Sequence, residues 1–199
     1  MNYPKTIKDL IDCFKKLPGI GEKTAERLAL STLNLDNEIN CLFSESIKNI
    51  KTKIKRCKIC NNLTEDDFCE ICKDSSREQM VVCVVEEAKN VILFEKVGTY
   101  KGLYHVLDGL ISPLDGINPE DIKLNSLLKR IEKGIIKEVI IAVKPSIEGE
   151  TTALYISKLL EKSNVKISKI AHGIPIGADM EYIDALTLEL ALENRTTIS

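Results

Sequence analysis

Four cysteines in two closely spaced pairs have the residue type and the spacing to hold a metal ion. Two residues separate Cys57 from Cys60, eight residues follow, and two residues separate Cys69 from Cys72. Two such pairs can supply four thiolates to one tetrahedral ion, and an all-thiolate set favours zinc. Because four protein ligands leave no open position for a substrate, we expect one structural zinc ion per chain. An iron–sulfur cluster and a redox-active dithiol are the alternative interpretations.

A glycine-containing segment near the N-terminus has the composition of a phosphate contact. Gly19 and Gly21 flank one isoleucine between two predicted helices. Glycine allows positive φ angles and a close backbone approach, and the second helix starts with unpaired N–H groups that suit a phosphate oxygen. Lys23 and Arg27 lie four residues apart, so they share a helix face that can meet neighbouring phosphates. The segment resembles the helix-hairpin-helix motif, which binds a DNA backbone without reading its sequence; the alternative is a plain turn with two solvated charges.

Charge is distributed unevenly along the chain, although the net charge is only −2. Residues 1–60 carry 12 Lys and Arg against 7 Asp and Glu, whereas residues 61–199 carry 16 against 23. A basic first part and an acidic second part suggest separate partners, with nucleic acid the candidate for the first. A run of basic residues supports that expectation, and a solvated helix face is its alternative interpretation. The run consists of Lys48, Lys51, Lys53, Lys55, Arg56 and Lys58.

Acidic residues follow two predicted strands in the second part of the chain. Glu86 and Glu87 come after the apolar run 81–85, and Glu148 follows the apolar run 139–143 at a short distance. Open parallel sheets place their sites at the carboxyl ends of the strands. The pattern resembles the Toprim domain of topoisomerases and primases, in which a Glu and an Asp-x-Asp pair hold Mg²⁺ for phosphoryl transfer. The alternative is that these acids favour helix N-termini.

The Asp-x-Asp positions of that resemblance fall on Lys144 and Ser146. Serine is a poor ligand for Mg²⁺, and the lysine puts a positive charge where a carboxylate would bind a dication, which it repels. The sequence also offers no identifiable catalytic tyrosine. It therefore predicts a Toprim scaffold without the chemistry, and no enzymatic activity.

The hydrophobic patterns place these residues on an α/β multidomain chain. Periodicity of 3.6 predicts N-terminal helices over 5–16, 22–33 and 39–54. Strands over 81–85, 104–107, 138–143 and 165–171 alternate with helices over 91–96, 124–133 and 151–161. This alternation predicts a mainly parallel sheet with helices on both faces, followed by a last helix over 182–193. The longest apolar run has six residues, so we expect no membrane span and a cytoplasmic protein.

The remaining cysteines and one histidine lie within these apolar patterns. Cys13, Cys41 and Cys83 are expected to be core residues, because a free cysteine packs as a small hydrophobic side chain. His105 follows Tyr104 in a predicted strand, which favours a structural histidine over a catalytic one.

Taken in order, the parts resemble the RecR family of recombination mediators over essentially the whole chain. The strings that carry the resemblance are 17–21, the four cysteines, 84–87, 104–107, 112–116, 148–155 and 173–182. The resemblance divides the chain into a helix-hairpin-helix domain (1–53), a four-cysteine zinc-finger module (54–76), a Toprim domain (77–172) and a C-terminal Walker-B-like segment with a helix (173–199). Departures from the family are Ala88 where Pro is usual, Lys144 where Asn or Asp is usual, and Lys169 where Arg is common.

The resemblance implies a non-catalytic, DNA-binding mediator of homologous recombination and DNA repair. Such proteins act with RecO, and sometimes RecF, to help RecA load on single-stranded DNA. They form homo-oligomers, either dimers or ring tetramers, and have no small-molecule substrate. Gly19, Gly21, Lys23 and Arg27 match the positions that contact DNA. Glu86 and Glu148 match a surface that engages RecO.

One enzymatic alternative follows from the same motifs, and a second activity, ATP hydrolysis, is unsupported. A Toprim-type metal-dependent nuclease or a topoisomerase-like enzyme would need an atypical metal site in place of Lys144 and Ser146. ATP hydrolysis would need a phosphate-binding Gly-x4-Gly-Lys-Ser/Thr string, which the sequence lacks, so residues 179–184 have no Walker A partner. A protein-interaction module whose hairpin does not touch DNA is a third interpretation.

Overall fold

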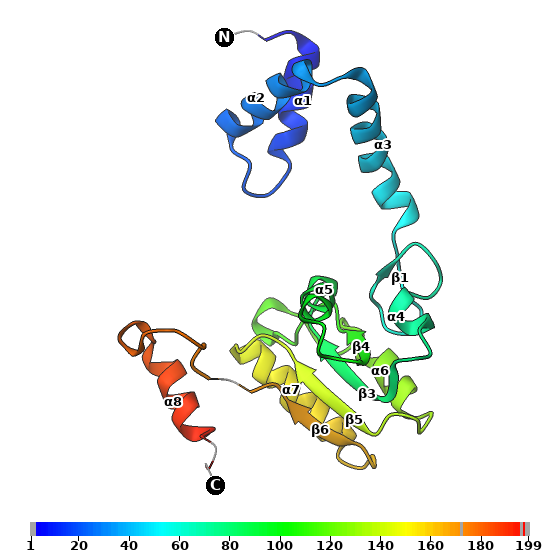
Figure 1. The fold of residues 1–199 in the computed structure, drawn as a ribbon, viewed down its shortest axis with the longest axis vertical. Coiled ribbons are helices and arrows are strands. Elements are labelled where there is room, and N and C mark those ends of the chain that lie inside the picture. The colour runs from blue at the N-terminus through cyan, green and yellow to red at the C-terminus, as the bar shows by residue number, and fades with distance from the viewer. Residues whose placement is uncertain (1–2, 172, 196, 198–199) are drawn as a thin grey trace. The chain divides into compact units, whose positions relative to one another are not determined.

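The computed structural model describes residues 3–171, 173–195 and 197, and the chain forms two compact units, Met1–Ile54 and Lys55–Ser199. The first unit is helical, and the second carries a small two-stranded module, a four-stranded sheet and a C-terminal helix (Figure 1). This order confirms the predicted fold class: a helix-hairpin-helix part, a cysteine module, a Toprim-type α/β domain and a C-terminal helical segment. No described helix is long and apolar enough to cross a membrane.

The first unit contains α1 (Lys5–Lys15), α2 (Glu22–Ser31), a short 3-10 helix (Thr32–Asn34) and α3 (Asn37–Lys53). α1 and α2 pack on a small core of Ile11, Ala25 and Ala29. The two alanines let the helices approach closely, and Ile20 from the hairpin packs against the same core. The apolar side chains of α3 are exposed, among them Leu42 at 65% and Ile50 at 64%.

The second unit begins with β1 (Lys55–Arg56) and β2 (Leu63–Thr64), an antiparallel pair, and α4 (Glu70–Lys73). The sheet that follows has four parallel strands in the order β4-β3-β5-β6. Their bounds are β3 (Glu78–Val85), β4 (Gly102–Val106), β5 (Glu138–Ala142) and β6 (Lys166–Lys169). β3 and β5 occupy the middle, which explains why their sequences are almost continuously apolar.

Helices cover both faces of this sheet, as predicted. Side chains from α6 (Leu124–Ile131) and α7 (Ile147–Leu160) pack against Val82 and Val84 on one face. Side chains from α5 (Ala88–Val97) pack against Cys83 and Val85 on the other. Successive residues of β3 therefore face opposite cores, because side chains alternate along a strand.

The starts of α7 (Ile147–Leu160) and of the last helix differ from the sequence-based expectation because of capping residues. α7 begins four residues earlier than predicted, since the Ser146 hydroxyl accepts a hydrogen bond from Gly149 N at 3.2 Å. The last helix, α8 (Ala185–Glu193), begins later than predicted, because Asp184 caps it through Thr187 N at 2.9 Å. A short 3-10 helix (Met180–Tyr182) precedes it.

The expectation that Cys13, Cys41 and Cys83 are all core residues is wrong for two of them. Cys83 is buried in the sheet, where desolvation raises the pKa of its thiol to about 12. Cys13 and Cys41 are exposed. Their helices each bury a narrower face than the apolar pattern of the sequence suggested.

Candidate metal centre and nucleic-acid interface

The four predicted metal ligands come together in the cysteine module. The Sγ atoms of Cys57, Cys60, Cys69 and Cys72 all lie within 4.8 Å of one another. Tetrahedral zinc–sulfur bonds of about 2.3 Å place neighbouring sulfurs roughly 3.8 Å apart, so the cluster has the right size for one ion. Cys57, Cys60 and Cys69 are each less than 5% exposed, as befits a closed structural centre.

Local backbone hydrogen bonds form each cysteine pair into a turn. Asn61 N donates to Cys57 O at 2.9 Å, and Cys72 N donates to Cys69 O at 3.0 Å. The pairing of β1 with β2 closes the first turn, and Cys69 N points at the Cys57 sulfur at 3.3 Å. These hydrogen bonds of the chain itself therefore place the two turns face to face.

The close spacing of the four sulfurs favours a cation in this cluster. Cys60 Sγ and Cys69 Sγ are only 3.4 Å apart. Their mutual hydrogen bond raises the pKa of Cys60 and lowers the pKa of Cys69, so one thiolate forms at the expense of the other. Four thiolates at this spacing repel one another unless a dication lies between them, and zinc supplies that charge. The donor set and its geometry therefore fit one structural zinc ion.

The metal centre is attached to the edge strand of the sheet. Val106 N donates to Cys60 O at 2.8 Å, and Asn61 Nδ2 donates to Val106 O at 3.1 Å. Arg56 adds an ion pair to Asp108 at 2.6 Å. Since an edge strand presents unpaired backbone groups, these contacts both fix the module and protect β4.

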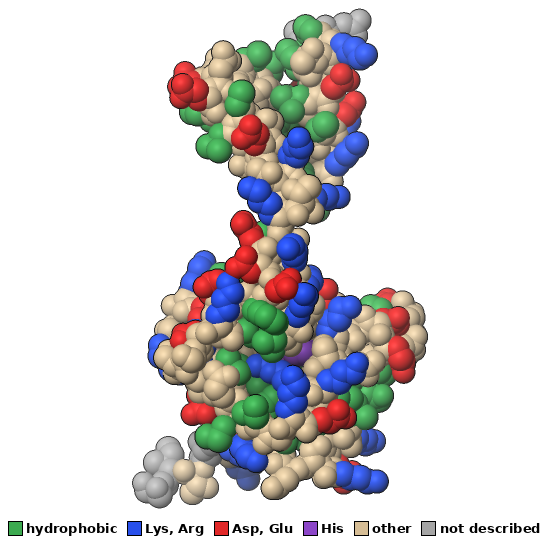
Figure 2. Space-filling view, turned by 90° about the vertical axis from the view of Figure 1, so that its right-hand side faces the viewer, with side chains coloured by type: hydrophobic (Ala, Val, Ile, Leu, Met, Phe, Trp, Pro, Cys, Tyr) green, Lys and Arg blue, Asp and Glu red, His purple; other side chains and the backbone are tan. Residues whose placement is uncertain are grey.

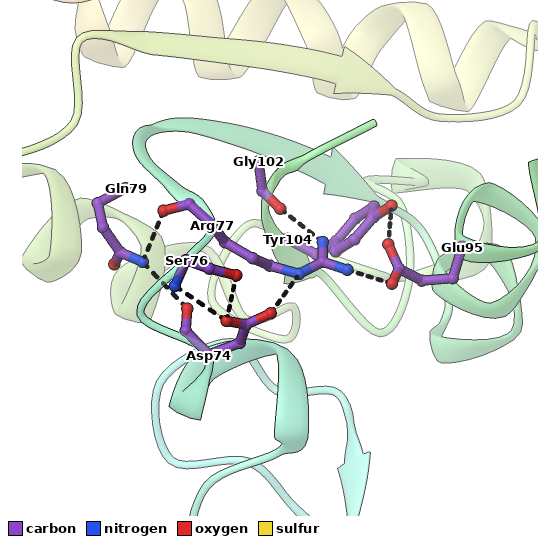
Figure 3. A network of polar contacts seen from close by, with 7 residues as sticks. All are labelled: Asp74, Ser76, Arg77, Gln79, Glu95, Gly102 and Tyr104. Carbon is purple, nitrogen blue, oxygen red and sulfur yellow. Dashed lines mark hydrogen bonds and ion pairs between the residues drawn. The ribbon is translucent and has the colours of Figure 1, made fainter. Parts of the chain in front are cut away.

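A second set of polar contacts holds the other end of the module to the same strand (Figure 3). Arg77, whose side chain is 14% exposed, donates to Gly102 O at 2.9 Å and pairs with Glu95. Tyr104 donates to Glu95 at 2.8 Å, and Asp74 lies 3.8 Å from the Arg77 guanidinium. Sequence reasoning missed this network, because its members are far apart along the chain and share no pattern.

The hairpin of the first unit is open to a ligand. Gly19 has a φ of +80°, which favours glycine, and no described atom lies within 4 Å of a Cβ built on Gly19 or Gly21. No described side chain caps the start of α2. Lys23 and Arg27 are exposed, and no ion pair or hydrogen bond joins either side chain to another described residue. Open N–H groups and two available cations at one helix end suit a phosphate backbone.

The basic run divides between the two units. Lys48, Lys51 and Lys53 lie on α3, with the last two in its final turn. In the zinc module, Arg56 pairs with Asp108 and Lys58 pairs with Asp67 at 2.7 Å. Figure 2 shows acidic side chains beside the basic ones over this module. The lysines of α3 are thus better placed for DNA than the paired residues that follow them.

The acidic residues of the sheet edge are engaged by neighbouring side chains of the protein. Glu86 follows β3, and its carboxylate lies 3.4 Å from Lys144 Nζ. The Ser146 hydroxyl donates to Glu148 at 2.7 Å, and this hydrogen bond is the main cause that lowers the pKa of Glu148. Glu87 is a helix-terminal acid, since its N–H donates to the Asn90 side chain at 2.8 Å. An ammonium group and a donating hydroxyl do not fit Mg²⁺.

Two further expectations concern residues outside these sites. His105 is fully buried, with Nε2 2.9 Å from Lys123 O, and desolvation lowers its pKa to about 4. This agrees with a core histidine.

Asp179 and Asp184, in the segment that resembles a Walker B motif, accept hydrogen bonds from backbone N–H groups at helix starts. Lys169, where the family commonly has Arg, forms an ion pair with Glu150, with 2.8 Å between Nζ and the carboxylate.

Four family models match consecutive parts of the chain. Residues 7–50 match the RecR helix-hairpin-helix model, and residues 54–74 match the model of the RecR zinc finger domain with four cysteines. Residues 80–171 match the Toprim domain, and residues 173–196 match the RecR C-terminal model. The order of these matches is the order in which the structure presents the corresponding parts.

Proposed function

The chain belongs to the RecR family, and on that premise we propose that it is a non-catalytic, DNA-binding mediator of homologous recombination and DNA repair. A zinc-binding recombination and repair protein is what the domain content supports most directly. The observation that carries DNA binding is the open hairpin, where two exposed cations follow two glycines at an uncapped helix start. The contact is to the backbone, because the motif offers amides and charges rather than groups that read bases.

The DNA-binding residues we propose are Gly19, Gly21, Lys23 and Arg27. Replacing Lys23 and Arg27 by glutamate should weaken binding to labelled single-stranded DNA by roughly tenfold or more at low salt. It should also make the salt dependence of the affinity shallower, because two phosphate contacts are lost. The matched control makes the same charge change at the start of α1, with Lys5→Glu and Lys8→Glu. Equal affinities for both double variants and the wild type would refute the assignment.

The mediator role further implies partners that we propose from the family alone. We propose that the protein acts in the cytoplasm with RecO, and sometimes RecF, to help RecA load on single-stranded DNA, and that it works as a dimer or ring tetramer. The division into 1–53, 54–76, 77–172 and 173–199 stays a prediction as well. Glu86 and Glu148 are the residues we propose for RecO.

The partner surface can be tested with neutral variants of the same shape. Glu86→Gln with Glu148→Gln should weaken binding of purified RecO, as measured by calorimetry. The exposed acids Glu132 and Glu161 provide a control pair, changed in the same way. If the control pair weakens RecO binding as much as the test pair, the assignment of Glu86 and Glu148 is wrong.

The enzymatic alternative has a direct test. Incubation of plasmid DNA with the protein and Mg²⁺ or Mn²⁺ should leave the DNA intact, because Lys144 and Ser146 offer no metal ligand set. Nicking that disappears in the Glu86→Ala variant would establish a Toprim nuclease and overturn the proposal.

A further inference from the structure

The carboxyl edge of the sheet keeps most of the architecture of a cation site. Glu86 stands at the end of β3 and Lys144 at the end of β5, on the two central strands of the sheet. Beside them lies a surface hollow of about 330 Å³, which Glu86, Lys144 and Asn90 line together with apolar residues. The Glu86 side chain is 18% exposed, so its charge is partly removed from water and needs a partner.

Gly149 brings a second carboxylate to the same place. A Cβ at this position would collide with the carbonyl oxygen of Lys144, so only glycine lets the start of α7 lie directly on the end of β5. That approach puts Glu148 in the first turn of α7, close enough for the Lys144 charge to contribute to lowering its pKa. One carboxylate therefore pairs with the Lys144 ammonium, and a second, from a different element, lies within the range of its charge.

We propose that Lys144 is a resident counter-ion, which takes the place of a divalent cation beside the acidic residues of this edge. Its side chain reaches Glu86 at 3.4 Å and stays 54% exposed, so the ammonium lies at the mouth of the site and not in the core. A dication approaching Glu86 must displace this tethered charge or bind beside it, and both are unfavourable. The exclusion of metal from this edge thus depends on one side chain.

Ser146 takes part in the same arrangement. Its hydroxyl accepts from Gly149 N at 3.2 Å and donates to Glu148 at 2.7 Å, so its oxygen is committed to the helix start and its proton to a carboxylate. Serine at this position stabilises α7 and orients Glu148 without requiring a metal ion. Loss of the lysine charge alone should therefore be enough to admit a cation, with Glu86 and Glu148 as ligands.

The test is a gain of metal binding in zinc-loaded protein. In Mn²⁺ titrations followed by electron paramagnetic resonance, the wild type should bind no Mn²⁺ at this edge, and Lys144→Asp should bind one equivalent at least about tenfold more tightly. Mn²⁺ prefers oxygen ligands, so it does not compete for the thiolates. Adding Glu86→Gln to the Lys144→Asp variant should abolish the gain. Mn²⁺ should also raise the thermal midpoint of the single variant.

A matched control lies at the opposite edge of the sheet. Lys166 pairs with Glu138 at 3.2 Å, and the Ser168 hydroxyl donates to the same carboxylate at 2.7 Å. Lys166→Asp makes the same charge change in this Lys–Glu pair, which also has a neighbouring serine. It brings only two carboxylates together, so this variant should bind no Mn²⁺. Lys144→Gln removes the positive charge without adding a carboxylate, so it separates loss of the charge from gain of a ligand.

The inference rests on the proposed function only in treating this edge as non-catalytic, and metal binding is measured apart from DNA cleavage and DNA binding. Wild-type protein that binds Mn²⁺ as tightly as Lys144→Asp, with the ion located at Glu86, would overturn it. So would a folded Lys144→Asp variant that binds no Mn²⁺. Loss of DNA binding, or nicking of DNA, would instead bear on the proposed function.

Discussion

The zinc module and the carboxyl edge of the Toprim sheet both gather side chains of the kinds that bind metal ions. In the module, four thiols lie within 4.8 Å of one another, and their sulfurs form hydrogen bonds with other cysteines of the module. At the sheet edge, the carboxylates of Glu86 and Glu148 are already served by an ammonium group and a hydroxyl. The difference shows that residue type alone does not make a metal site. A group of potential ligands needs a metal ion only where no neighbouring side chain already compensates its negative charge.

The largest effect is expected where the ion is needed. Cys57→Ser should release zinc, unfold the module and lower the free energy of unfolding by several kcal/mol, because metal binding supplies the folding free energy of so small a segment. Zinc content by mass spectrometry and the midpoint of thermal unfolding measure both effects. Cys41→Ser changes an exposed thiol and should do neither. Retention of one zinc per chain with normal stability would show that the module does not depend on its ligands.

The next prediction concerns the backbone that positions the sheet edge. Gly149→Ala places a methyl group against the Lys144 carbonyl, so it should cost about 3 kcal/mol of stability and shift the start of α7. Gly173→Ala meets no described atom within 4 Å and is the control. Chemical denaturation measures the difference between the two variants. Equal stability would mean that α7 does not need its close approach to β5, and the edge would then have more freedom than the structure shows.

Acid should act on the sheet through a buried group, independently of zinc. His105 has a pKa of about 4 in the folded protein, and an ordinary pKa near 6.5 when unfolded. The unfolded chain therefore binds the proton first, and stability is lost as pH falls from about 6.5 to 4, by roughly 3 kcal/mol in total. His105→Phe should remove this component of the pH dependence. Parallel measurement of zinc release separates it from protonation of the thiolates, and an unchanged pH profile in the variant would contradict it.

A smaller effect is expected at the contact between the two regions. Asn61→Ala removes the side-chain hydrogen bond to Val106 O and leaves a buried carbonyl without that donor, so it should cost about 1–2 kcal/mol. The zinc affinity should change little, because the thiolates are untouched. Hydrogen exchange at β4 reports whether the strand edge opens. Faster exchange of the β4 amides without loss of zinc would show that Asn61 attaches the module to the sheet and is not needed to bind the ion.

Local patterns in the sequence predicted these regions better than the contacts between them. The cysteine spacing identified the metal ligands, since a four-residue turn brings each pair together. The alternating strands and helices predicted the parallel sheet, and alignment of short strings put Lys144 beside the acids. The start of α7 was missed because the Ser146 cap and the close approach of Gly149 to the Lys144 backbone, which make residues 147–150 part of the helix, leave no mark in the hydrophobic pattern.

Contacts that join distant residues left no trace in the sequence. Arg77 meets Glu95, and Asn61 meets Val106, although each pair is widely separated along the chain, and no periodicity encodes such pairs. Exposure of Cys13 and Cys41 was likewise unpredictable, since an apolar helix pattern does not tell how much of a face a partner helix covers.

Metal content at equilibrium tests the contrast between the two regions most directly. After dialysis against excess Mn²⁺ and Mg²⁺, native mass spectrometry of the wild-type chain should show one zinc ion and no second ion. The zinc should be lost in Cys57→Ser, and a second ion should enter when the Lys144 charge is removed, as it is in Lys144→Asp. A wild-type chain that carries zinc together with one Mn²⁺, and loses the Mn²⁺ in Glu86→Gln, would contradict the account.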